Sequence, residues 1–204
     1  MKALLVVDIQ NDFCPGGALA VPNGDSIIPT VNSLIERFDT VIQTQDWHPA
    51  DHSSFASNHE NKEPYETIEA SYGTQVLWPD HCVQGTKGAE FHPELITDKS
   101  QVIIRKGFRR EIDSYSTFFE NDQKTPTGLS GYLKERGITD LYTVGLATDF
   151  CVKWSVLDGI DEEFTMHIVE DAVRGIDLNG SLQQAWKEMN KKGVKIVKAA
   201  EIFV

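Results

Sequence analysis

The chain has 204 residues, of which 40% are hydrophobic and 25% are charged, and its net charge is −12. This length and composition suit one soluble globular domain spanning residues 1–204, and the lack of a basic cluster argues against nucleic acid or an anionic membrane as a partner. No apolar stretch approaches the ~20 residues of a membrane span, we expect no signal peptide, and three cysteines are too few for a disulfide scaffold, so a cytoplasmic location is predicted.

Six short segments rich in β-branched residues are predicted to be strands. In chain order they are residues 3–8, 40–46, 101–107, 141–147, 164–171 and 194–199. Several are nearly continuous in Val, Ile and Leu, which is typical of strands buried on both faces of a parallel sheet. Helical patterns separate most of these strands. The sequence therefore predicts an α/β fold with three α/β/α layers and a mostly parallel six-stranded sheet.

Apolar residues recur with helical spacing in residues 25–38, 128–137 and 181–193. Asp25 or Ser26 can cap the first helix, and Pro29 falls in its first turn, where a missing N–H costs least. The other two helices are predicted to end at glycines that can take the left-handed conformation, Gly137 and Gly193.

One connection is much longer than the others. Residues 47–100 have no strong periodic pattern, and connections of this length in compact domains are usually functional. The segment contains five of the six histidines, which are His48, His52, His59, His81 and His92. We therefore predict a metal-binding insertion at about 47–100.

Chemically active side chains stand near the carboxyl ends of the predicted strands. Asp8, Asp46, Lys106 and Asp171 lie at four of these ends, and Cys151 follows a fifth strand by one short turn. Ligands of open α/β sheets bind at this edge, so we expect carboxylates, a lysine and a thiol to meet there. Taken singly, each residue also has a structural interpretation, as a turn cap, a solvated charge or a core cysteine.

The position of Cys151 suits a nucleophile. Thr148 can cap the helix that follows, and a thiol in the first turn lies near the positive end of the helix dipole, which favours the thiolate. No histidine is close in sequence, so Asp8 is the available base and Lys106 the available cation. The backbone N–H groups of Ala147 and Cys151 can bind a developing oxyanion.

A second set of residues suggests a metal site. Asp46 and His48 are two residues apart, and His81 lies in the same insertion. One oxygen and two imidazole nitrogens suit Zn²⁺, Fe²⁺ or Mn²⁺. The alternative is a hydrogen-bonded loop without a metal, because an Asp-x-His motif by itself is a weak signal.

Five segments together resemble the nicotinamidases of the isochorismatase-like cysteine hydrolase superfamily. They are VVDIQNDF (6–13), QDWHPADHSSFASNH (45–59), LWPDHCVQGTKGAEFHP (77–93), KGFRREIDSYSTFF (106–119) and GLATDFCVKWSVLDG (145–159). The segments keep the order and approximate spacing of that family. The resemblance implies hydrolysis of the small molecule nicotinamide to nicotinic acid and ammonia in NAD salvage, with pyrazinamide as a further substrate.

The resemblance also implies roles for particular residues. It assigns catalysis to Asp8, Lys106 and Cys151 through a Cys151 thioester, and the oxyanion hole to Ala147 and Cys151. It assigns one divalent metal, with zinc favoured over iron or manganese, to Asp46, His48 and His81.

Further implications concern the surroundings of these residues. The aromatic walls of the substrate pocket map onto Phe13, Trp78 and Tyr115. The peptide between Leu146 and Ala147 would be cis. His52 or Ser53 is the candidate for an additional metal ligand, and a homo-oligomer is compatible with the family.

Three other interpretations stay open from the sequence. The chain can be another hydrolase of the same superfamily, acting on a different small amide or on isochorismate. A thiol-based binding or redox protein would need a second cysteine near Cys151, and the sequence has no Cys-x-x-Cys motif. A metal-binding module without catalysis is the third interpretation.

Overall fold

The central sheet has six strands in the order β5-β2-β1-β6-β7-β8, and all of its pairings are parallel. The strands are β1 (Lys2–Val7), β2 (Val41–Asp46), β5 (Val102–Lys106), β6 (Asp140–Leu146), β7 (Thr165–Arg174) and β8 (Lys195–Val197). The computed structural model describes residues 1–203. The predicted fold class is confirmed.

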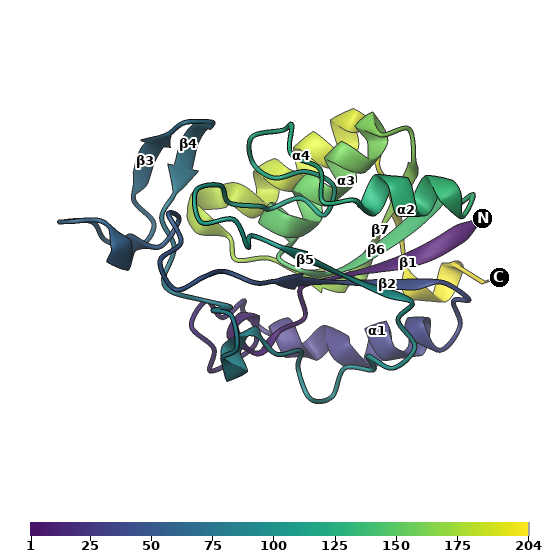
Figure 1. Ribbon diagram of the computed structural model, residues 1–204. Helices are drawn as coiled ribbons and strands as arrows, with labels where there is room; N and C mark the ends of the chain where they lie inside the picture. The colour runs from purple at the N-terminus through teal and green to yellow at the C-terminus, as the bar shows by residue number, and fades with distance from the viewer. Residues whose placement is uncertain (204) are drawn as a thin grey trace.

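Helices cover both faces of this sheet. One face packs against α1 (Ile28–Ile35), and the other packs against α2 (Leu129–Glu135), α3 (Lys153–Asp161) and α4 (Ser181–Lys192) (Figure 1). Along β1, Leu4 and Val6 join the core on the α1 side, while Leu5 and Val7 join the core on the other side. Successive strand residues point to opposite faces, so burial on both sides requires the continuous apolar run seen in the sequence.

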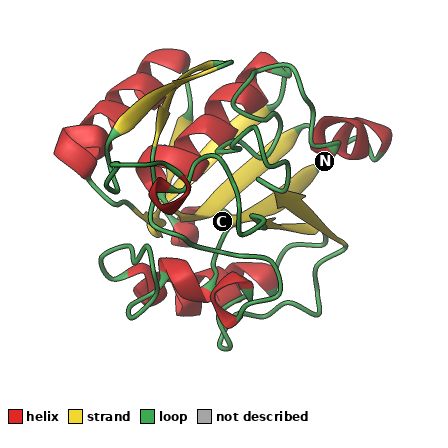
Figure 2. Cartoon of the chain, turned by 60° about the vertical axis from the view of Figure 1, so that its left-hand side comes forward, coloured by secondary structure: helices red, strands yellow, loops and turns green. Residues whose placement is uncertain are grey.

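The strand order reverses between β1 and β6. From β1 the chain proceeds outward through β2 and β5, whereas from β6 it proceeds the other way through β7 and β8. Such a switch point leaves a crevice at the carboxyl ends of the two central strands. Figure 2 brings this edge forward and shows the loops that cross in front of it.

The first helix differs from its prediction at the N-terminal end. A 3₁₀ turn occupies Gly24–Ile27, and α1 begins only at Ile28 with Pro29 in its first turn. Neither Asp25 nor Ser26 caps the helix, because the preceding turn supplies backbone hydrogen bonds there instead. The predicted glycine stops are confirmed, with positive φ at Gly137 and Gly193.

The prediction that Asp171 ends a strand is wrong. The strand β7 continues to Arg174, and its register against β6 shifts between Thr143 and Gly145. Asp171 is exposed within β7 and accepts a hydrogen bond from the Ala199 backbone N–H at 3.0 Å. It therefore takes no part in the cluster at the carboxyl edge.

The long insertion contains a β-hairpin that the sequence did not predict. Its strands are β3 (Thr67–Ala70) and β4 (Gly73–Val76), paired antiparallel and projecting beyond the carboxyl edge of the sheet (Figure 1). Each strand has only four residues, and the apolar ones are only half-buried, so the alternation is too short to predict a strand from the sequence. Within residues 1–203, no helix combines the length and apolar character needed to cross a membrane.

Short 3₁₀ turns complete the connections. They are Asn11–Phe13, Gly24–Ile27, Ala56–Asn58, Lys87–Ala89, Leu178–Gly180 and Ala199–Glu201.

Candidate active site and metal cluster

Three strand ends bring Asp8, Lys106 and Cys151 together. Asp8 follows β1 directly, Lys106 is the last residue of β5, and Cys151 lies in the turn after β6. The Lys106 Nζ is 2.8 Å from Asp8 Oδ2 and 3.4 Å from Cys151 Sγ. All three side chains are buried. The parallel sheet thus gathers the residues that the sequence predicts at this edge.

Lys106 is a fully buried cation held by several acceptors. Besides Asp8, its ammonium forms a close ion pair with Asp46 and donates to the Ser114 carbonyl at 2.9 Å. Burial by itself would favour the neutral amine, but Asp46, Asp8 and Cys151 together raise the Lys106 pKa well above its usual value. Lys106 therefore stays charged between the two carboxylates.

The two carboxylates that share Lys106 have opposite protonation tendencies. Burial raises the pKa of Asp8, and the opposing effects of Lys106 and of the Thr44 hydroxyl, which donates at 2.6 Å, do not cancel it. Burial acts on Asp46 too, but Lys106 and His81 lower the Asp46 pKa below its ordinary range. Asp46 is thus the permanent anion, and Asp8 is the carboxylate that more readily accepts a proton.

The turn that carries Cys151 differs from the expected capped helix. Residues Thr148–Val152 form a π-helical turn before α3, and Ala147 occupies the cap position without a side-chain hydrogen bond. Thr148 therefore lies inside the turn and does not cap it. The Leu146–Ala147 peptide is cis, as the resemblance implies.

The expectation of a resting thiolate is also corrected. Burial raises the pKa of the Cys151 thiol well above its ordinary value, and the lowering effect of Lys106 does not compensate. Asp8 and Asp46 add to the rise because negative charges disfavour a second anion. The thiol is consequently protonated at rest, and it needs a base. An oxygen of Asp8 lies within 4.8 Å of the sulfur.

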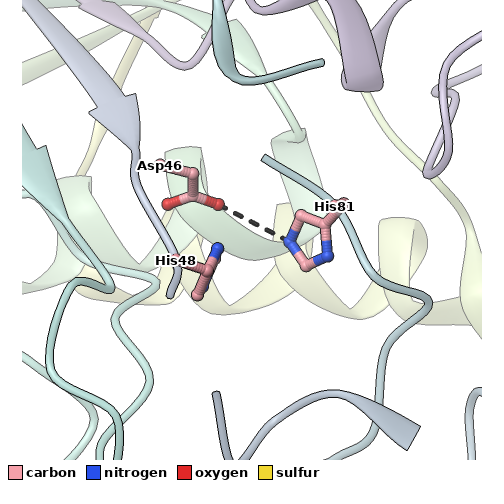
Figure 3. Close-up of side chains that lie close together, drawn as sticks. All are labelled: Asp46, His48 and His81. Atoms are coloured by element: carbon pink, nitrogen blue, oxygen red, sulfur yellow. Dashed lines mark ion pairs between the residues drawn. The ribbon is translucent and has the colours of Figure 1, made fainter. Parts of the chain in front are cut away.

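Asp46, His48 and His81 form a buried cluster next to these residues (Figure 3). Asp46 ends β2, His48 follows two residues later, and His81 comes from the distant part of the insertion. The three donor atoms lie within 4.8 Å of one another, with 3.8 Å between Asp46 Oδ2 and His81 Nε2. The structure thus brings together the three predicted metal ligands.

The donor set fits a divalent transition metal. The His81 Nδ1 is 2.8 Å from the Pro79 carbonyl, which can only accept, so Nδ1 carries a proton and Nε2 is the nitrogen available to a metal beside Asp46. Within residues 1–203, the Nδ1 of His48 is buried without a hydrogen-bond partner. One carboxylate oxygen and two imidazole nitrogens suit Zn²⁺, Fe²⁺ or Mn²⁺.

His52, one of the two candidates for an additional ligand, is not grouped with Asp46 and His81, but its ring lies with His48 and Asp113 in a second set of donor atoms within 4.8 Å of one another. The role of Ser53 stays a prediction. The two ring nitrogens of His52 are 2.7 Å from the Ser54 hydroxyl and 3.3 Å from the Ile112 carbonyl. Its ring instead packs edge-on against His48, with 4.6 Å between centroids.

Asp113 is a site residue that the sequence reasoning missed. It is buried, and its Oδ1 lies 3.2 Å from His48 Nε2. Although burial acts in the opposite direction, the adjacent His48 lowers the Asp113 pKa to about 2, so this carboxylate stays ionised. It adds an oxygen donor beside the metal cluster. Its only signal in the sequence was an acidic residue in the segment after Lys106.

One pocket is lined by residues of both groups. It is narrow, and its lining consists of Phe13, Leu19, Asp46, Trp78, His81, Asp113, Tyr115, Ala147, Phe150, Cys151 and Ile176. The three predicted aromatic walls are among these residues. Phe150, Leu19 and Ile176 were not predicted. Phe150 stands perpendicular to Trp78 with 4.9 Å between ring centroids, so the two rings form one corner of the pocket.

Known proteins resemble this chain along nearly its whole length. The isochorismatase domain matches residues 2–201. A nicotinamidase of Acinetobacter baylyi is 56% identical over 202 residues, which cover 99% of this chain and 94% of that protein. A solved nicotinamidase/pyrazinamidase of Acinetobacter baumannii has a TM-score of 0.97 and 57% identity, covering 99% and 98% of the two chains. The pyrazinamidase of Pyrococcus horikoshii, solved in complex with zinc, has a TM-score of 0.79 and 38% identity, covering 97% and 98%.

Proposed function

The chain belongs to the isochorismatase family, and we propose on this basis that it is a nicotinamidase, an amidohydrolase that converts nicotinamide to nicotinic acid and ammonia. One observation carries the proposal. Cys151, which contacts the buried Lys106 beside Asp8, lines the same small aromatic pocket as the metal-cluster residues Asp46 and His81. Such a pocket can hold a flat ring at one end and a carboxamide over the thiol at the other.

Asp8 begins the reaction by accepting the proton of the Cys151 thiol. Its raised pKa suits this role, because a base whose pKa approaches the working pH can both accept and return a proton. Lys106 stabilises the thiolate as it forms, since its ammonium is already 3.4 Å from the sulfur.

The thiolate then attacks the amide carbon, and the carbonyl oxygen becomes an oxyanion. The backbone N–H groups of Ala147 and Cys151 stabilise this oxyanion. Protonated Asp8 gives its proton to the leaving nitrogen, the C–N bond breaks, and ammonia departs from a Cys151 thioester. Water activated by Asp8 hydrolyses the thioester, which releases nicotinic acid and restores the thiol.

Asp46, His48 and His81 are the residues that would hold the metal, and zinc is the ion we favour over iron or manganese. The donor set and the zinc complex of the Pyrococcus horikoshii relative support this choice. When bound, the metal would supply a Lewis-acidic site for the ring nitrogen of a pyridine. The protein itself fixes the distance between that anchor and Cys151.

The aromatic walls select the substrate by shape. Phe13, Trp78 and Tyr115, together with Phe150, enclose a flat ring and exclude bulk water from the thiol. Pyrazinamide replaces one ring C–H of nicotinamide with nitrogen and keeps the same outline. We therefore include pyrazinamide as a second substrate, which the name of the Acinetobacter baumannii relative supports.

Ammonia release from nicotinamide tests this proposal. We expect the wild-type protein to release ammonia, and Cys151→Ala to lose about 10⁴-fold or more in kcat while it retains its thermal stability and metal content. Unchanged release by the variant would refute the cysteine mechanism. A wild-type protein that does not hydrolyse nicotinamide but hydrolyses another small amide would refute the proposal that nicotinamide is the substrate.

A further inference from the structure

The β3–β4 hairpin has one buried side chain among its strand residues. Seven of the eight strand positions are exposed or only half-buried, whereas Gln75 is 1% exposed. A buried polar side chain on an exposed hairpin needs hydrogen-bond partners, since its desolvation is otherwise uncompensated. Those partners show what the hairpin is attached to.

Gln75 Nε2 donates toward the metal cluster and toward a wall of the pocket. It lies 2.9 Å from Asp113 Oδ2 and 3.0 Å from the Tyr115 hydroxyl, and also 2.7 Å from the Val76 carbonyl of its own strand, so its two N–H groups are shared among three acceptors. Asp113 contacts the metal-cluster residue His48 through its other oxygen, and the Tyr115 hydroxyl accepts a hydrogen bond from Trp78 Nε1 at 3.1 Å. The amide thus stands between the metal cluster and an aromatic wall of the pocket.

Gln75 Oε1 faces the opposite way and accepts two hydrogen bonds. The Tyr72 hydroxyl and the Asn121 Nδ2 each donate to it at 3.1 Å. Tyr72 belongs to the turn of the hairpin, and Asn121 accepts the Tyr115 backbone N–H at 3.0 Å. The acceptor side of the amide therefore fixes its orientation, and the donor side holds the two functional neighbours.

We propose that Gln75 is a positioning residue that couples the metal site to the substrate pocket, by holding Asp113 beside His48 and Tyr115 against Trp78. The inference rests on the proposed nicotinamidase function for the identity of the substrate, but not for the metal-binding effect. Only an amide of this length presents donors to Asp113 and Tyr115 and an acceptor to the hairpin at the same time.

Two substitutions separate these contributions. Gln75→Met preserves the approximate volume and removes every side-chain hydrogen bond. Gln75→Glu keeps the acceptor for Tyr72 and Asn121, but it loses the donor and places a second buried carboxylate next to Asp113. Thr74→Val is the matched control, because Thr74 is an exposed neighbour on the same strand whose hydroxyl only reaches Glu69 at 3.0 Å.

The first measurement is the affinity of the metal-free protein for Zn²⁺, obtained by competition with a chromophoric chelator without substrate. We expect the Zn²⁺ Kd to rise about 10-fold in Gln75→Met and more in Gln75→Glu, as for other residues that orient metal ligands. Thr74→Val should match the wild type. A Kd within twofold of the wild type in Gln75→Met, or in Gln75→Glu, would overturn the proposal, because a purely structural role would lower only the melting temperature.

A double-mutant cycle with Asp113→Asn tests the route of the effect. If Gln75 acts through Asp113, then Gln75→Met should change the Zn²⁺ Kd less than twofold in the Asp113→Asn background. Additive losses would contradict the proposed route. The KM for nicotinamide should also rise several-fold in Gln75→Met with a smaller change in kcat, and an unchanged KM would refute the coupling to the pocket.

These outcomes are distinguishable from a failure of the proposed function. Zinc affinity is measured without turnover, so it reports on Gln75 even if the wild-type protein does not hydrolyse nicotinamide. Conversely, a wild-type protein that is active on nicotinamide and a Gln75→Met variant with normal Zn²⁺ affinity would refute only the role of Gln75.

Discussion

The candidate active site has two halves that are positioned by different means. The strand-end half consists of Asp8, Lys106 and Cys151, which follow or end buried parallel strands. The insertion half consists of His48, His81 and Trp78 together with the β3–β4 hairpin, and irregular segments carry most of it. The backbone ladder of the sheet fixes the first half, so the positions of its side chains follow from strand register.

The insertion half depends instead on individual polar contacts. His81 is held by the Pro79 carbonyl, and the hairpin is attached through the Gln75 amide. Such networks are rigid when every partner is present, but each one lost leaves a buried polar group unsatisfied. We infer that substitutions in this half change affinity in graded steps, whereas those in the strand-end half abolish function.

Lys106 joins the two halves, so its removal should have the largest effect. Lys106→Met would leave Asp8 and Asp46 buried without their shared cation. We expect the free energy of unfolding to fall by about 3–5 kcal/mol, and kcat/KM to fall by about 10³-fold or more. Urea denaturation and ammonia release measure these changes. Lys99→Met, which removes an exposed pair with Glu36, should cost less than about 1 kcal/mol. Equal effects of the two variants would contradict the role of Lys106.

Metal removal tests the insertion half alone. After dialysis against a chelator, we expect kcat/KM for nicotinamide to fall by about 10²-fold and to recover on addition of Zn²⁺, because the ring anchor is lost. The rate at which iodoacetamide alkylates Cys151, followed by peptide mass spectrometry, should change less than about twofold, since none of Asp8, Lys106 and Cys151 is a proposed metal ligand. A large fall in both kcat/KM and the alkylation rate of Cys151 would show that the two halves are not separable.

Phe150→Leu probes the corner where the halves meet. Phe150 precedes the nucleophile in sequence, and its ring stands against Trp78 of the insertion. We expect the KM for nicotinamide to rise about 2–10-fold with little change in kcat, because an aromatic pair contributes roughly 0.5–1.5 kcal/mol. Steady-state kinetics measure the effect. Phe108→Leu, at an exposed phenylalanine outside the pocket, should leave KM unchanged. A fall in kcat without a change in KM would contradict the role of Phe150 as a wall of the substrate pocket.

The smallest expected effect is a shift in the pH dependence of activity, which depends on Asp8 in the strand-end half. Asp8 must be deprotonated to accept the thiol proton, and its pKa is raised, so activity should disappear in acid at a higher pH than for an ordinary aspartate of about 3.9. Thr44→Val removes the hydroxyl that stabilises the Asp8 carboxylate and should move the acidic limb of kcat/KM further upward. An acidic limb that stays in place or moves to lower pH in Thr44→Val would contradict the assignment of Asp8 as the base.

The sequence alone determined the fold class and most of the strand-end half. Continuous apolar runs such as that in β1 require burial on both sides, which only a covered parallel sheet provides. Once the strands are parallel, residues at their carboxyl ends share one edge, so the meeting of Asp8, Lys106 and Cys151 could be predicted from local patterns. The family motifs added the three metal-cluster residues.

Tertiary structure alone decided the remaining features. The extension of β7 past Asp171 and the partnership of Gln75 with Asp113 depend on contacts between segments that are distant in the chain, and no local periodicity reports them. The hairpin pairs residues that are close in sequence, but its four-residue strands are too short for a clear periodic signal. The protonation of Cys151 was decided in the same way. A helix terminus is visible in the sequence and favours a thiolate, but burial and two nearby carboxylates exist only in the folded molecule and outweigh it.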